Sequence, residues 1–142
     1  MFAFDNQSNE RFIQAHYEQN HDKLERVRAL MCHIMNVHHI WISRVLDRPV
    51  ESEDWDDLPF HAWSDLNEDN HRLTLFALEQ LDVQARVSYV TSEGESMNKS
   101  VGEILSHILW HSNYHRAQIN LLLRQADLEP LECNLISHPI VY

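Results

Sequence analysis

The segment SVGEILSHILWHSNYHRAQINLLLRQA, residues 100–126, carries the clearest helix signal in the chain and decides the fold class. Ser100 and Glu103 have the spacing of a capping box, in which each side chain accepts a hydrogen bond from a backbone N–H at the start of a helix. No proline interrupts the segment, and Pro130 follows it. We therefore expect one long helix from Ser100 to about Ala126.

One face of this helix is apolar at both ends and polar in the middle. At steps of three and four residues it reads Val101, Ile104, Ile108, His111, His115, Gln118 and Leu122. Burying an imidazole without a hydrogen-bond partner costs about 1–3 kcal/mol, so the two histidines need partners. His111 and His115 are one helical turn apart, which allows both to bind one metal ion. Two core histidines bonded to carbonyls or carboxylates would fit the same pattern, so spacing leaves both interpretations open.

The rest of the chain also favours helices, because glycine and proline are scarce. Further helices are expected at three places: about Asn9 to Tyr17, Lys23 to about Leu46, and a third capped by Ser64 that runs to about Leu81. The third helix is expected to turn four apolar residues inward: Leu66, Leu73, Phe76 and Leu81. Residues 84–91 predict a short extended piece, and residues 91–99 a turn. The whole chain, residues 1–142, is thus predicted to be one all-α domain, a four-helix bundle.

A long loop, residues 47–62, is expected between the second and third helices of this bundle. It contains two prolines, and five acidic residues lie around Trp55: Glu51, Glu53, Asp54, Asp56 and Asp57. A solvated connection is one interpretation. A lid beside a pocket is the other, because long loops in compact domains often carry function.

Composition excludes several classes of protein. The chain has 22 acidic residues, 11 Lys and Arg, and a formal net charge of -11, which argues against nucleic-acid binding. Two distant cysteines, Cys32 and Cys133, exclude a disulfide framework and a zinc knuckle. Neither a membrane span nor a secretory signal is expected, so we predict a cytoplasmic protein.

A metal site on the last helix needs a ligand from elsewhere, because catalytic sites typically use three protein ligands and keep a position for water. The chain has 11 histidines, and the second helix carries three of them: His33, His38 and His39. His38 falls on the main apolar seam of that helix, whereas His33 lies on a neighbouring stripe. Periodicity does not decide between them.

Two segments resemble the DinB-like family. CHIMNVHHIWISR, residues 32–44, resembles its second helix, which shows a His, a Trp eight residues later and then an Arg. ILSHILWHSNYHRAQI, residues 104–119, resembles its final helix, with the pattern H-x-x-x-H-x-x-x-H-R-G-Q. The resemblance covers essentially the whole chain. Ala117 departs from the usual Gly, and Trp110 stands where Asn is common.

This resemblance implies a four-helix bundle, often a homodimer, that holds a divalent metal through His33, His111 and His115. His33 is preferred because it occupies the position of the family motif, and His38 is the fallback. Zinc and nickel are the expected ions, since imidazole suits both.

The function that the resemblance implies is a metal-dependent enzyme acting on a small molecule. Transfer of a low-molecular-weight thiol is the first possibility and metal-assisted hydrolysis the second, because a divalent ion lowers the pKa of a bound thiol or water. The alternative is a non-catalytic, metal-binding dimeric helical module. A closed site with four protein ligands would favour this alternative, and an open position beside a cleft would favour catalysis.

Other residues receive simpler predictions. His107 is expected beside the ligands, Arg116 in a salt bridge, and Gln118 in a hydrogen bond within the pocket. Trp41 and Tyr114 are expected to pack, and Cys32 to be a small buried hydrophobe. Five histidines are predicted to lie on the surface or in loops: His16, His21, His61, His71 and His138.

Overall fold

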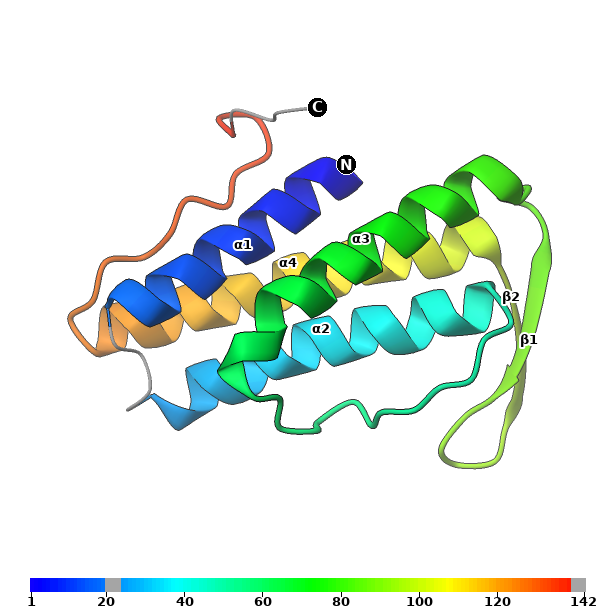
Figure 1. The fold of residues 1–142 in the computed structure, drawn as a ribbon, viewed down its shortest axis with the longest axis horizontal. Coiled ribbons are helices and arrows are strands. Elements are labelled where there is room, and N and C mark those ends of the chain that lie inside the picture. Colours follow the sequence, from blue (N-terminus) through cyan, green and yellow to red (C-terminus); the bar gives the residue numbers. More distant parts are fainter. Residues whose placement is uncertain (20–23, 139–142) are drawn as a thin grey trace.

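The computed structural model describes residues 1–19 and 24–138 and contains four long helices (Figure 1). They are α1 (Phe2–Glu18), α2 (Glu25–Val45), α3 (Trp63–Gln80) and α4 (Val101–Gln125), with a short 3-10 turn, η2 (Phe60–Ala62), before α3. The predicted helical bundle is therefore confirmed. The predicted start of the second helix, Lys23, lies outside the described residues.

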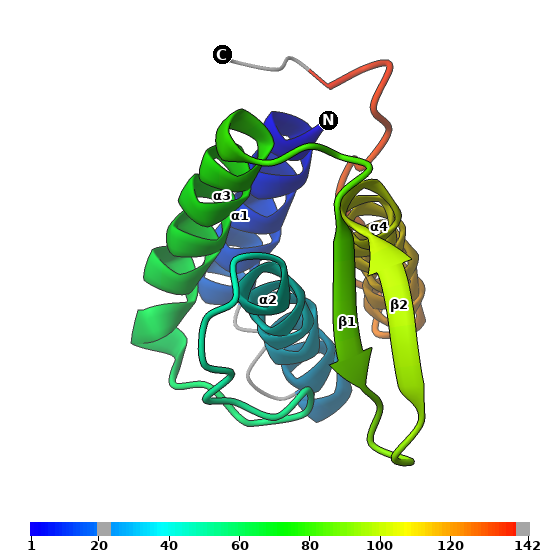
Figure 2. The same ribbon diagram turned by 90° about the vertical axis from the view of Figure 1, so that its right-hand side faces the viewer.

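A β-hairpin corrects the all-α prediction. β1 (Arg86–Val90) lies within the extended piece expected at residues 84–91, and it pairs antiparallel with β2 (Ser96–Ser100). The turn expected over residues 91–99 is thus partly a strand. The sequence of β2, SMNKS, has no alternation of apolar and polar residues, so the residue pattern did not predict this strand. The hairpin lies beside α2 and α4 at one end of the bundle (Figure 2).

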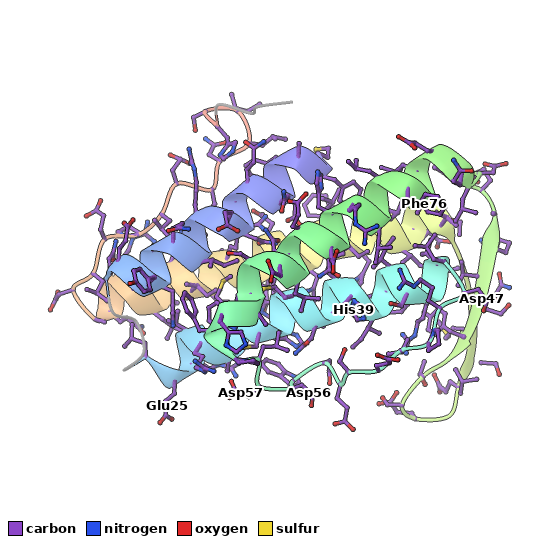
Figure 3. All side chains as sticks on the ribbon, viewed as in Figure 1. Glu25, His39, Asp47, Asp56, Asp57 and Phe76 are labelled. Carbon is purple, nitrogen blue, oxygen red and sulfur yellow. The ribbon has the colours of Figure 1, made fainter. Side chains whose placement is uncertain are left out.

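The helix directions determine the path of the chain between α2 and α3. These two helices run the same way, and α1 and α4 run opposite to them (Figure 1). The connection must therefore return along the length of α2 before α3 can begin. Figure 1 shows residues 46–59 following α2, and Figure 3 shows Asp56 and Asp57 on this stretch. The loop consequently lies next to side chains that α2 turns outward.

The core has apolar ends and a polar middle. One buried cluster gathers around Phe12, Leu30 and Trp63, and the other around Ile42 and Ala77. Buried polar side chains from all four helices also belong to the interior: Asp5, Asn9, Asn36, His38, Asn70, Thr74, Ser112 and Arg116. Hydrogen bonds join Arg116 to Asp5 and Asn9, and they link His38, Thr74 and Asn70 in a second group.

The strongest of these interactions pairs α1 with α4. Arg116 Nη1 donates to Asp5 Oδ1 at 2.7 Å and to Asn9 Oδ1 at 2.6 Å, and all three side chains are almost fully buried. The salt bridge predicted for Arg116 is confirmed. The helix α1 begins at Phe2, seven residues before the predicted start at Asn9. Its first turns bury the polar Asp5, Ser8 and Asn9 together with Phe2 and Phe4, so polar residues interrupt the apolar pattern that marks a helix.

Two predictions about α3 were wrong. Ser64 does not cap the helix, which begins at Trp63 after η2, and its hydroxyl donates to Glu10 Oε1 at 2.9 Å. Phe76 is 52% exposed on the outer face of α3 (Figure 3). Polar Asn67 and Asn70 share the buried face, which shifted the apparent apolar stripe.

The capping box of α4 is confirmed. Ser100 Oγ accepts from the Glu103 N–H at 3.1 Å, and Glu103 Oε2 accepts from the Ser100 N–H at 2.8 Å. Among the helices that the structure describes, none combines the length and apolarity needed to cross a bilayer.

Removing one partner of the buried ion pair should be costly. We expect Asp5→Ala to lower the free energy of unfolding by about 3–5 kcal/mol, because it leaves a buried guanidinium without its carboxylate. Asp69→Ala, which breaks the exposed pair with Arg72, is the control and should cost at most about 1 kcal/mol. Urea denaturation measures both, and equal losses would contradict the account.

Candidate metal centre

Three of the predicted histidines converge on one point between α2 and α4. His111 Nε2 lies 3.1 Å from His33 Nε2 and 3.2 Å from His115 Nε2. One ligand atom from each residue lies within 4.8 Å of the other two. Nitrogens bound to one tetrahedral ion at 2.0–2.1 Å are about 3.3 Å apart, so the spacing fits a metal ion held by three imidazoles.

Hydrogen bonds at the Nδ1 atoms of His33 and His115 determine the tautomers of these two rings. His33 Nδ1 lies 2.7 Å from the carbonyl oxygen of Asp54, and His115 Nδ1 lies 2.7 Å from Gln118 Oε1. Both partners are acceptors, so both Nδ1 atoms carry the proton and donate. Each Nε2 of these neutral rings is left with a lone pair directed at the common point. This is the arrangement that metal-binding histidines use.

The connection after α2 holds His33 from outside. The ring of Trp55 stacks on the His33 ring, with centroids 3.7 Å apart and planes 8° from parallel. The Arg26 guanidinium in turn lies over the Trp55 ring, 5.1 Å from its centroid. The carbonyl of Asp54 and the ring of Trp55 together fix the position and orientation of the imidazole. This segment therefore shapes the site and does not only connect two helices.

The environment of His33 and His111 favours their neutral form. Burial, followed by the neighbouring His115 and His33, lowers the pKa of His111 to about 3. Burial also lowers the pKa of His33, against a smaller raising effect from the Asp54 carbonyl. Neutral imidazoles are the form that binds metal.

His38 and His107 lie outside the cluster. His38 Nε2 is 2.9 Å from Thr74 Oγ1 on α3, and the Thr74 hydroxyl donates to the Asn70 carbonyl, so His38 is the donor to Thr74. His38 thus points into the core and away from the three rings. His107 lies next to the cluster, its ring centroid 5.6 Å from that of His111, and packs edge-on against Trp41.

The remaining histidines divide into two groups. His16 and His138 are buried, against the prediction of a surface or loop position: His16 packs between Phe60 and Trp63, and His138 meets Phe4 edge-on. Aromatic neighbours distant in sequence bury them. His61 is exposed and His71 half-buried, and His21 lies outside the described residues.

Four further predictions can be compared with the structure. The Gln118 amide binds His115, as expected, and Cys32 is buried. Trp41 packs against Tyr89 and His107. Tyr114 packs edge-on against His115 but remains 62% exposed, because it lies on the outer face of α4.

A cleft of about 780 Å³ opens beside the cluster, and His33, His107 and His111 line one part of it. Its walls come from α2, the connection after α2, the hairpin and α4. Two features of this cleft could not be predicted from the sequence. Any residue could have supplied the Asp54 carbonyl, and Tyr89 enters the wall only because the hairpin folds back onto α2.

Comparison with known proteins gives one match. The sequence model of the DinB family matches residues 6–140. Searches of curated proteins and of solved structures returned no match.

Acidification should destabilise the metal-free protein. Burial lowers the pKa of His38 to about 4 from an ordinary value of 6.5, so between these values the unfolded chain binds a proton that the folded chain excludes. This contribution is fully present above pH 6.5 and is lost as the pH falls towards 4. It amounts to about 3 kcal/mol. Urea titrations across this range should show a smaller loss for His38→Gln, which lacks the titrating ring. A loss equal to that of the control His61→Gln would contradict the assignment.

Proposed function

The chain belongs to the DinB family, and on this premise we propose that it is a divalent-metal-dependent enzyme that acts on a small molecule. His33, His111 and His115 would hold the ion. Three neutral imidazoles add no negative charge, so a bound zinc or nickel ion would keep its full charge and lower the pKa of a water or thiol ligand.

This proposal rests on the three-histidine cluster having an open fourth coordination position. In the part of the chain that the structure describes, three residues and no fourth His, Cys, Asp or Glu form the group. His33 and His111 also line the cleft, so a small molecule in the cleft would reach the remaining position. A structural metal site is normally closed by four protein ligands. The geometry therefore favours catalysis over the alternative of a non-catalytic metal-binding module.

Among the described residues near the cluster, neither the cysteine thiol nor a serine or threonine hydroxyl is activated as a nucleophile. Cys32 is buried, and burial raises the pKa of its thiol, which lies 3.9 Å from Asp57 Oδ1. The serine and threonine hydroxyls of the cleft have no hydrogen bond to a histidine among the described residues: Ser52, Thr91 and Ser92. We therefore propose that the nucleophile is an external thiol or water molecule. Transfer of a low-molecular-weight thiol is proposed first, because the family resemblance favours it, and hydrolysis second.

Three associated expectations stay predictions. They are a homodimer, a cytoplasmic location and the absence of nucleic-acid binding. The last is supported by the net charge of -11.

Metal content tests the ligand set. Wild-type protein loaded with zinc should retain about one ion per chain after gel filtration, and His33→Ala and His111→Ala should retain almost none, because each removes one of three ligands. Elemental analysis gives the ratio. His38→Gln and His107→Ala are the matched controls and should keep the ion. Loss of metal from either control, with retention in His33→Ala, would overturn the assignment.

The open position has its own test. Cobalt-loaded protein titrated with 2-mercaptoethanol should develop a sulfur-to-cobalt charge-transfer band, because a thiol can enter an open site. An unchanged spectrum would favour the closed, non-catalytic module.

The hydrogen bond from His115 to Gln118 should tune metal affinity. We expect Gln118→Ala to weaken zinc binding by about 10- to 100-fold, because the His115 Nδ1–H loses its acceptor and the ring loses its fixed orientation. Competition with a chromophoric chelator measures the affinity. Gln125→Ala, at the exposed end of α4, is the control, and an equal effect there would exclude a specific role for Gln118.

A further inference from the structure

One face of α2 lines the cleft, with His33 near one end of this face and Arg44 near the other. The residues of α2 that line the cleft are His33, Val37, Ile40, Trp41 and Arg44. Steps of four, three, one and three residues keep them on one side of the helix. His33 and Arg44 are eleven residues apart, so their Cα atoms are separated by about 16 Å along the axis. The cleft thus has the histidines at one end and Arg44 at the other.

Arg44 is held by aromatic rings and not by an acid. Its guanidinium carbon lies 4.7 Å from the ring centroid of Trp41 and 5.1 Å from that of Tyr89. Among residues 1–19 and 24–138, no carboxylate forms an ion pair with it, although the chain has 22 acidic residues and 11 Lys and Arg. Cation–π contact with these rings does not pair the N–H groups of the guanidinium as a carboxylate would, so these groups remain available to a ligand.

The other charges of the cleft lie away from Arg44. Glu53 and Asp54 line it from the connection after α2, and the Asp54 carbonyl accepts from His33, so this part of the wall belongs to the histidine end. Between the two ends, Val37 and Ile40 form an apolar floor. These three parts of the cleft match an elongated ligand that has an apolar middle and one anionic end.

We propose that Arg44 binds the carboxylate end of such a small molecule, whose apolar middle crosses Val37 and Ile40 and whose other end reaches the three histidines. A carboxylate can accept two parallel hydrogen bonds from one guanidinium, which gives the contact both strength and direction. Only the histidine end of this inference rests on the proposed function. The contact with Arg44 requires no metal.

Binding of octanoate to the metal-free protein tests the contact. Calorimetry should show octanoate binding at least about ten times more tightly than octan-1-ol, since only octanoate makes charge-assisted hydrogen bonds. Affinity should rise about three- to fourfold for each methylene between hexanoate and octanoate, as the chain covers the apolar floor. Arg44→Gln should weaken octanoate binding about tenfold or more and leave octan-1-ol unaffected.

Two variants complete the experiment. Arg44→Lys keeps the charge and should recover part of the affinity, and Arg48→Gln, an exposed arginine outside the cleft, should bind octanoate as the wild type does. No preference for octanoate over octan-1-ol, or equal binding by wild type and Arg44→Gln, would overturn the proposal. Octanoate bound through Arg44 by a chain that binds no zinc would overturn the proposed function and leave this inference standing. If the chain binds zinc but Arg44→Gln binds octanoate as tightly as the wild type does, the proposed function stands and the role of Arg44 is overturned.

Discussion

The buried ion pair between Arg116 and Asp5 sets the rotation of α4, and the site depends on that rotation. Arg116 turns one side of α4 towards α1, where Asp5 and Asn9 accept its hydrogen bonds. His115 immediately precedes Arg116, and its side chain is rotated by about 100° around the helix axis, so it is turned towards α2 with His111 one turn before it. A buried guanidinium tolerates little displacement, because losing its carboxylate is costly. The same interaction that closes the core therefore aims two imidazoles at His33.

The topology of the bundle supplies the remaining part of the site. Because α2 and α3 run in the same direction, their connection has to return along α2 (Figure 1). This path brings the Asp54 carbonyl and the Trp55 ring onto His33, and it closes one wall of the cleft. The hairpin between α3 and α4 closes another wall with Tyr89, over Trp41 and Arg44.

The sequence predicted the parts of this arrangement that depend on local patterns. The capping box located the start of α4, and the spacing of His111 and His115 placed both on one face. The choice of His33 over His38 came from a family motif, because α2 is buried on nearly every side and its apolar periodicity could not separate them. The start of α1 was missed since polar residues occupy its buried face. β2 and the contact of Asp54 with His33 depend on tertiary pairing, which leaves no trace in residue spacing.

X-ray absorption spectroscopy of the zinc-loaded protein counts the imidazoles around the ion and measures their distances. We expect three imidazole nitrogens at about 2.0 Å and one further light-atom ligand that is replaced by sulfur when a small thiol is added. Fewer than three imidazoles, a fourth ligand from the chain, or the same spectrum from His33→Ala would contradict this expectation.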